Sequence, residues 1–184
     1  MKTMNLVLAL FITLLSSELA IAQSTLISNF EQHTLLGRGE ITASGSEIVS
    51  YFQEGMAITR LDKRFGLVNA QGIEILSPRF DEIRPFNNGY AAAKNEGKWT
   101  FINKQGKKLS TFRYDWVGNF ENGYAPVNKS GKWGFVNEQG IEICNINFEV
   151  VRAFENGNAK VRKDGIWYLL SEKGTLTLPG SEQA

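Results

Sequence analysis

Residues 120–140 read FENGYAPVNKSGKWGFVNEQG, and this stretch decides the fold. Two short runs rich in β-branched and aromatic residues, 123–128 and 132–137, are separated by a turn that ends at Gly131, and a second turn ends at Gly140. Glycine adopts positive φ at little steric cost, so both glycines suit tight turns. The pattern predicts a β-hairpin, followed by a third short strand over 141–144.

The same pattern recurs every 34 residues along the chain. A phenylalanine opens each unit, and these residues are Phe52, Phe86, Phe120 and Phe154. An aromatic residue falls later in each unit, at Phe65, Trp99, Trp133 and Trp167. Helical tetratricopeptide units have this period too, but recurrent glycines would each cost a helix about 1 kcal/mol, and the apolar residues alternate. The repeat therefore favours strands.

Turn chemistry within the units supports this interpretation. Asparagine opens and glycine closes the turn after the second run, in the pairs Asn69 and Gly72, Asn103 and Gly106, and Asn137 and Gly140. Such pairs are typical of a type I turn closed by a glycine bulge. The first unit has Lys63 where later units have a hairpin glycine, which predicts a looser first hairpin.

The predicted fold is all-β: a tandem array of four 34-residue, three-stranded antiparallel β-repeats. One face of each unit, carrying Trp99 and Phe101 in the second, needs a neighbouring unit to bury it, in either an open solenoid-like array or a propeller-like ring. The array is expected over 47–178, because Glu47 and Val49 fall one period before Asp81 and Ile83. Residues 179–184 are expected to form a C-terminal tail.

The first residues resemble an export signal. Lys2 precedes an apolar run over 6–15, and small residues at 20–22 end it before Gln23. Residues 1–22 are therefore predicted to be a cleaved signal peptide, and 23–46 a non-repetitive lead-in. The apolar run is too short to span a bilayer, so we expect a periplasmic or extracellular chain that is not inserted in the membrane.

The motif Gly131-Lys-Trp-Gly-Phe-Val-Asn137, together with Pro78-Arg-Phe-Asp81, resembles a unit of the WG-repeat family, also called KWG repeats. The Trp-Gly pair itself survives only at Trp133-Gly134. The equivalent pairs are Phe65-Gly66, Trp99-Thr100 and Trp167-Tyr168. The resemblance implies an all-β bacterial module, often exported, without an assigned enzymatic activity and with a presumed role in binding. It supplies no catalytic residue.

Composition weighs against several functional classes. Twenty Lys and Arg balance nineteen Asp and Glu, so no long-range field attracts nucleic acid. His33 is the single histidine and Cys144 the single cysteine, which predicts neither a catalytic triad, a metal site nor a bound cofactor. We therefore expect a protein that is not an enzyme.

One recurring set of acids keeps an enzymatic alternative open. Asp81, Asp115 and Glu149 follow the second aromatic column of their units. A cell-envelope hydrolase would require Asp81 and Asp115 to converge in a cleft, as paired carboxylates do. The structural interpretation is that each acid accepts turn N–H groups or pairs with nearby arginines, namely Arg79, Arg84 and Arg113.

Irregular positions are the best candidates for ligand contact. Trp116 stands where the other units have Glu82 and Val150, so the repeat does not require its ring. Tyr90 and Tyr124 occupy a second variable position. The leading hypothesis is a non-enzymatic binding or scaffolding module for a protein or polysaccharide. A structural, self-associating repeat domain is the further alternative.

Overall fold

The computed structural model describes residues 37–111 and 113–180, and these form an all-β array. The array lies in the second of two compact units, Arg38–Ala184. The predicted signal peptide over 1–22, His33 and the last four residues of the predicted tail fall outside the described residues. None of the described residues belongs to a helix long and apolar enough to cross a membrane.

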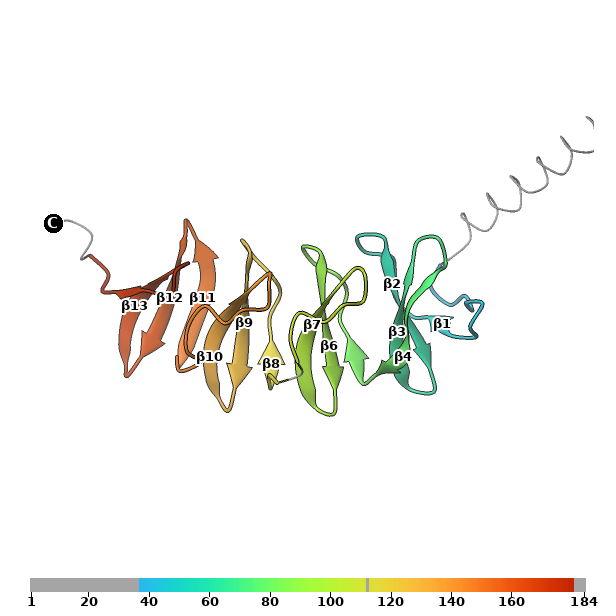
Figure 1. Ribbon diagram of the computed structural model, residues 1–184, viewed down its shortest axis with the longest axis horizontal. Helices are drawn as coiled ribbons and strands as arrows, with labels where there is room; N and C mark the ends of the chain where they lie inside the picture. Colours follow the sequence, from blue (N-terminus) through green and yellow to red (C-terminus); the bar gives the residue numbers. More distant parts are fainter. Residues whose placement is uncertain (1–36, 112, 181–184) are drawn as a thin grey trace, which may run out of the picture. The chain divides into compact units, whose positions relative to one another are not determined.

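Four antiparallel sheets follow one another in chain order, and in the structure each sheet with its turns is one unit, so that Arg84 belongs to the second unit and Trp116 to the third. The first comprises β1 (Glu47–Ile48), β2 (Met56–Leu61), β3 (Arg64–Asn69) and β4 (Glu74–Phe80). The second comprises β5 (Glu82–Ile83), β6 (Tyr90–Asn95) and β7 (Lys98–Asn103). The third comprises β8 (Trp116–Val117), β9 (Tyr124–Lys129) and β10 (Lys132–Asn137). The fourth comprises β11 (Val150–Glu155), β12 (Asn158–Lys163), β13 (Ile166–Ser171) and β14 (Leu176–Thr177). The sheets lie in an open row, which confirms the predicted β-repeat array and its solenoid-like form (Figure 1).

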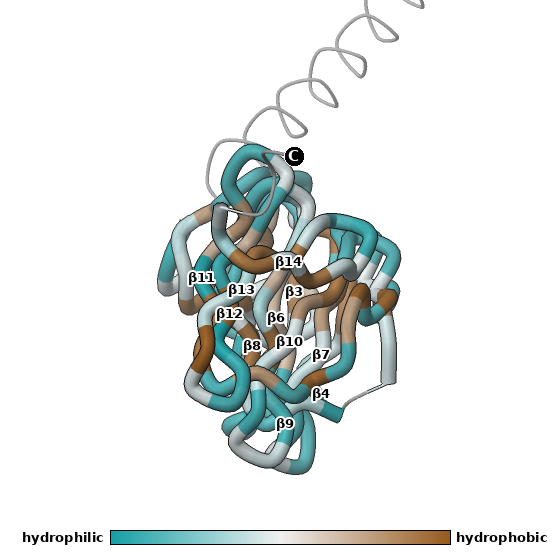
Figure 2. The backbone as a smooth tube through the Cα atoms, turned by 90° about the vertical axis from the view of Figure 1, so that its left-hand side faces the viewer, coloured by the Kyte–Doolittle hydropathy of each residue, from teal (hydrophilic) through white to brown (hydrophobic). Residues whose placement is uncertain are grey.

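Both faces of the two inner sheets are buried, because side chains alternate between faces along a strand. In the second sheet, Ala91 and Ile102 pack in a core cluster with residues of the first sheet. Ala92 and Phe101, one residue away on the same strands, pack in a cluster with residues of the third sheet. Figure 2 looks along the row and shows the hydrophilic turns at the periphery of the superimposed sheets.

The predicted asparagine turns are confirmed. Asn137 accepts hydrogen bonds through its side-chain oxygen from the backbone N–H groups of Gln139, at 3.1 Å, and Ile141, at 2.9 Å. Asn69 and Asn103 do the same in their units. The glycine that closes the turn has positive φ, 75° at Gly140. Asparagine and glycine thus fix the same turn in the first three units.

The first hairpin is not looser than the others, contrary to the prediction. Its central residues Asp62 and Lys63 have φ of 48° and 64°, close to the 49° and 78° of Glu96 and Gly97 in the second unit. Cross-strand pairing of β2 and β3 holds the same two-residue turn in place. Lys63 therefore occupies a left-handed conformation in which a side chain is disfavoured.

The predicted third strand over 141–144 is also absent, and only an isolated bridge joins Val136 to Glu142. The chain instead crosses the hairpin closely at Gly134, where an added Cβ would lie 2.9 Å from Cγ1 of Ile146. In the second unit Thr100 replaces this glycine and donates a hydrogen bond to the Ser110 carbonyl at 3.0 Å. The glycine of the Trp-Gly pair thus makes room for the crossing segment.

The array begins with β1, whose pairing is shifted by one residue from the position that the 34-residue period predicts. Ile48 pairs with Thr59, as Ile83 pairs with Ala93 in the second unit. Ile48 is fully buried and takes the place that the frame predicts for Val49. Because the lead-in is not constrained by the repeat, its register can shift by one to bury an isoleucine.

Polar contacts tie each unit to the next. The side-chain amides of Asn88 and Asn122 each donate to a phenylalanine carbonyl in the following unit, both at 2.7 Å. The hydroxyl of fully buried Tyr114 donates to the Glu142 carboxylate at 3.0 Å and accepts a hydrogen bond from Arg113. Burial, with Glu142 beside it, raises the pKa of Tyr114 to about 12.

Replacing Lys63 by glycine is expected to raise the free energy of unfolding by about 1 kcal/mol, since the left-handed region costs a side chain roughly 1–2 kcal/mol. Urea unfolding measures the change. The matched control is Gly97→Lys, because open space surrounds the Cβ position of Gly97 and only φ opposes the substitution. This control should lower the free energy of unfolding, and a neutral Lys63→Gly would contradict the interpretation.

Tyr114 should make unfolding pH-dependent in the alkaline range. Below its ordinary pKa of 10.0 the hydroxyl is protonated in both states, so the stability it contributes is constant. As pH rises toward about 12, the unfolded chain loses the proton while the folded chain keeps it, so this stability is progressively lost. The difference in unfolding free energy between wild type and Tyr114→Phe, measured against pH, should shrink across this interval. A difference that stays constant would refute the assignment.

Candidate functional site

The candidate site is built on one cross-strand row of the third sheet. Trp116 of β8 pairs with Asn128 of β9, which pairs with Trp133 of β10. Residues paired across antiparallel strands share a face, so both indoles project toward the fourth sheet. Their ring centroids are 5.4 Å apart and their planes meet at 68°, an edge-to-face arrangement.

Trp116 is exposed but held in place. Its relative exposure is 42%. Besides Trp133, its ring contacts Arg84 from the preceding unit. The Arg84 guanidinium carbon lies 5.5 Å from the centroid of the Trp116 ring, and Nη1 donates to the Val117 carbonyl at 2.8 Å. A cation on one side and an indole edge on the other therefore orient this ring before any ligand arrives.

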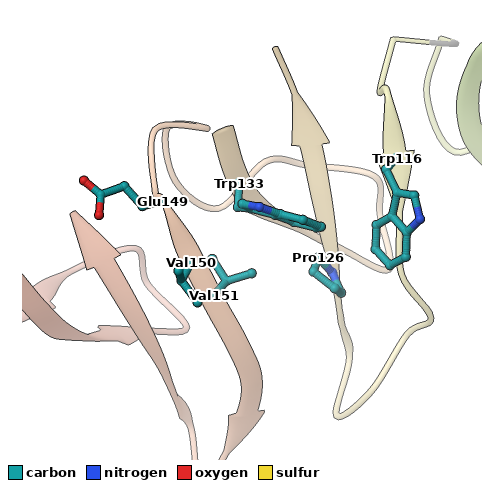
Figure 3. Close-up of a pocket in the computed structure, with 6 residues that line it drawn as sticks. All are labelled: Trp116, Pro126, Trp133, Glu149, Val150 and Val151. Carbon is teal, nitrogen blue, oxygen red and sulfur yellow. The ribbon is translucent and has the colours of Figure 1, made fainter. Parts of the chain in front are cut away.

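A hollow of about 340 Å³ opens beside the two indoles. The third sheet contributes Trp116, Trp133 and Pro126, and β11 contributes Val150 and Val151. Figure 3 shows Pro126 between the indoles and Val151 directed toward Trp133. The hollow also includes Glu149, whose carboxylate points away from the indoles (Figure 3). The part of the hollow nearest the indoles is therefore apolar.

A second hollow, of about 220 Å³, adjoins the first and shares Trp116, Pro126 and Val151 with it. Its distinctive residues are Glu121 and Arg152, which are both exposed. Among the described residues, no ion pair includes either of them. We call the two hollows together the Trp116 groove, which has an apolar half and a charged half.

The equivalent row is charged in the neighbouring units. The second unit has Glu82 and Lys94 in line with Trp99, and the fourth has Val150 and Arg162 in line with Trp167.

Arginine also covers the equivalent tryptophan in those units. Arg84 lies 4.0 Å from the Trp99 ring centroid and Arg152 lies 5.6 Å from that of Trp167. Gly118 occupies this arginine position in the third unit. Trp133 therefore has no arginine cover from its own sheet.

The structure separates the three ligand-contact candidates. Trp116 and Tyr124 both line the second hollow, whereas Tyr90 lines neither hollow of the groove. Tyr90 packs on Phe120 and Tyr124 stacks on Phe154, with ring centroids 4.6 and 4.2 Å apart. Burial raises the pKa of both tyrosines. Each half-buried tyrosine thus packs on the opening phenylalanine of the next unit.

The recurring acids each bind their own turn. Asp115 accepts a hydrogen bond from the Ser130 N–H at 2.6 Å and pairs with Lys98. Both contacts lower the pKa of Asp115, the lysine more strongly. Asp81 pairs with Arg64 and accepts from the Gly97 N–H at 3.4 Å.

Glu149 is held in the same way, by Arg162 at 2.9 Å and by the Gly165 N–H at 3.4 Å. The turn contacts are as predicted, but the cations are not the expected Arg79, Arg84 and Arg113. Each carboxylate is committed to its own turn, so the convergence of Asp81 and Asp115 that a hydrolase requires is not found.

One expectation about the tryptophan column needs correction. The face that carries it was expected to be buried by a neighbouring unit, and Trp99 is 3% exposed, but Trp167 is 36% exposed and Trp133 lines the groove. Sequence reasoning also missed Pro126 and Gly118 as parts of the site. Both were visible as departures from their columns, which hold Ala92 and Lys160, and Arg84 and Arg152.

Other chemistry is sparse in the described part of the chain. Its His, Cys, Asp and Glu residues form no group of three that could hold a metal ion. Cys144 is half-buried, and burial raises the pKa of its thiol, which disfavours the nucleophilic thiolate. The Trp116 groove, which is lined by two indoles, is therefore taken as the candidate binding site.

Comparison with solved structures gives distant likenesses. Hsv2p of Kluyveromyces lactis is 16% identical with a TM-score of 0.39, over 68% of this chain and 47% of that one. A chain of the S. cerevisiae structure "dbp5 l327v bound to nup159, gle1 h337r, ip6 and adp" is 9% identical with a TM-score of 0.38, over 79% of this chain and 44% of that one. The chain thus matches less than half the length of these structures, and neither likeness bears on its function.

No curated protein matches the sequence. A family model described as "WG containing repeat" matches three consecutive spans, 65–99, 99–133 and 133–167. Each span runs from one residue of the aromatic column to the next, and together they cover more than half of the chain. The chain therefore belongs to the WG-containing repeat family.

Proposed function

We propose that this chain is an exported, non-enzymatic binding module that holds a protein or glycan ligand in the Trp116 groove. The observation that carries the proposal is the paired, uncharged tryptophan row of the third sheet. The row departs from the repeat at Trp116 and Asn128, and Gly118 beside it departs as well. The scaffold does not need these changes, because the other units pack with charged residues there.

The shape and chemistry of the groove support binding. Large, rigid aromatic side chains supply contact area at little entropic cost and are enriched where proteins bind ligands. Trp116 is oriented by Arg84 and Trp133, so a ligand need not order it. Pro126 and the valines of β11 add fixed apolar walls.

The non-enzymatic part of the proposal rests on the side chains near the groove. Glu149, the acid beside the apolar half, is neutralised by Arg162 and a turn N–H. In the charged half, Glu121 and Arg152 suit the binding of charged ligand groups better than acid–base catalysis, since neither has a neighbouring group that would activate it for catalysis.

Ligand binding should perturb the indole N–H signals of Trp116 and Trp133 in an NMR titration with pools of soluble peptides and oligosaccharides. The buried Trp99 signal should stay in place. Trp116→Ala should weaken binding at least about tenfold, as central aromatic contacts do. Tyr51→Ala is the control, because Tyr51 is an exposed aromatic residue that lines neither hollow of the groove. Equal losses from the two variants would argue against this site.

Export rests on the predicted signal peptide. When the full chain is expressed in a bacterial host with an envelope, we expect mass spectrometry to find a mature N-terminus at Gln23 in the periplasmic or extracellular fraction. A Leu-to-Arg change within the apolar run should keep the unprocessed chain inside the cell. Uncleaved protein in the cytoplasm of cells that carry the unaltered sequence would contradict export.

A further inference from the structure

We infer that the Trp116 groove takes an extended polypeptide segment, which packs a proline or branched aliphatic side chain against the apolar half, beside Trp116 and Trp133, and places charged side chains in the other half. The inference rests on the proposed function and names the chemical class of its ligand. Three features of the groove lead to it.

First, the apolar half lacks the polar groups that a sugar requires. A saccharide that stacks on an indole also presents hydroxyl groups that need hydrogen-bond partners around the ring. Here the apolar walls beside the indoles are Pro126 and Val151, and the Glu149 carboxylate points away. A hydrocarbon side chain loses no hydrogen bonds on entering this half. Aromatic walls of this kind bind proline in polyproline II segments.

Second, the charged half complements a polypeptide. Arg152 and Glu121 line the same hollow, carry opposite charges and are exposed. A ligand segment with an acidic residue for Arg152 and a basic residue for Glu121 would match both, whereas a neutral polysaccharide would leave both unpaired. In an extended chain, residues two apart project to the same side about 6–7 Å from each other. One peptide segment can therefore fill both adjoining hollows.

Third, Trp133 of the third unit is left uncovered by arginine. Arg84 covers Trp99 in the second unit, and Gly118 replaces this arginine in the third. Even a Cβ at position 118 would lie 2.6 Å from Cγ of Pro126 and 3.3 Å from Cζ3 of Trp116. Gly118 is therefore a positioning residue, which lets Pro126 and Trp116 approach and keeps Trp133 uncovered.

The test selects peptides from a displayed random library on the full chain, with counter-selection on Trp116→Ala. Selected peptides are synthesised, and their affinities are measured by fluorescence anisotropy. We expect them to share a proline or aliphatic position and to bind Trp116→Ala at least about tenfold more weakly than wild type. Tyr51→Ala should bind like wild type, and Gly118→Arg should bind more weakly, with circular dichroism as the check on its folding.

Charge reversal tests the other half of the groove. Arg152→Glu should weaken peptides that carry an acid, and changing that acid to lysine should restore affinity for the variant. Glu121→Lys should show the opposite preference. Folding does not affect these comparisons, because the same variant protein is measured with both peptides.

Three other results would overturn the inference. If maltohexaose, cellohexaose or chitohexaose binds in a Trp116-dependent way and no peptide does, the ligand class is wrong while the proposed binding site stands. If neither peptides nor oligosaccharides depend on Trp116, the proposed function fails as well. Peptides whose binding ignores Trp116 but is lost in Tyr51→Ala would place the contact elsewhere.

Discussion

Burial of both faces of each inner sheet is the constraint on which the rest of the structure depends. A sheet with only two full-length strands cannot bury enough apolar surface alone, so each unit needs a neighbour on either side. Small residues such as Ala91 and Ala93 face one neighbour, and the large rings of Trp99 and Phe101 face the other. The turns keep this alternation in register, and polar ties such as Asn88 to the Phe120 carbonyl fix the spacing between units.

The binding groove arises where this constraint is relaxed. The third and fourth sheets still pack through Phe135, Phe154 and their neighbours, so the array is not interrupted. At one edge of that contact, however, Gly118 replaces an arginine, and the indole of Trp133 is left facing solvent beside Trp116. Binding chemistry is thus added at the margin of a packing interface whose centre remains a normal core.

Much of the fold could be predicted from the sequence because the repeat shows each structural requirement several times. Asparagine and glycine at fixed spacing identify the turns, and the aromatic column identifies the hairpin strands. Predictions failed where tertiary contacts override local preference. Lys63 adopts the glycine conformation because the paired strands impose it, Ile48 shifts the register to reach the core, and residues 141–144 leave the sheet to cross Gly134.

The site was only partly predictable, for a different reason. Trp116 was identifiable as a departure from its column, and it does line the groove. Trp133 matches the repeat and was expected to be buried with the rest of its face, yet its exposure is set by Gly118, which follows β8 and lies far from Trp133 in the sequence. Such a cross-strand relation appears only when the columns are compared along the paired strands.

The contact of each unit with its immediate neighbours has a consequence for how such arrays diversify. Arg84 and Gly118 occupy the same position in successive units, and each shapes only the interface that follows it. A change at one such position can open or close a groove there and leave the other interfaces intact. Duplication of a 34-residue unit would copy a groove together with its supporting strands, so ligand preference and array length can evolve independently.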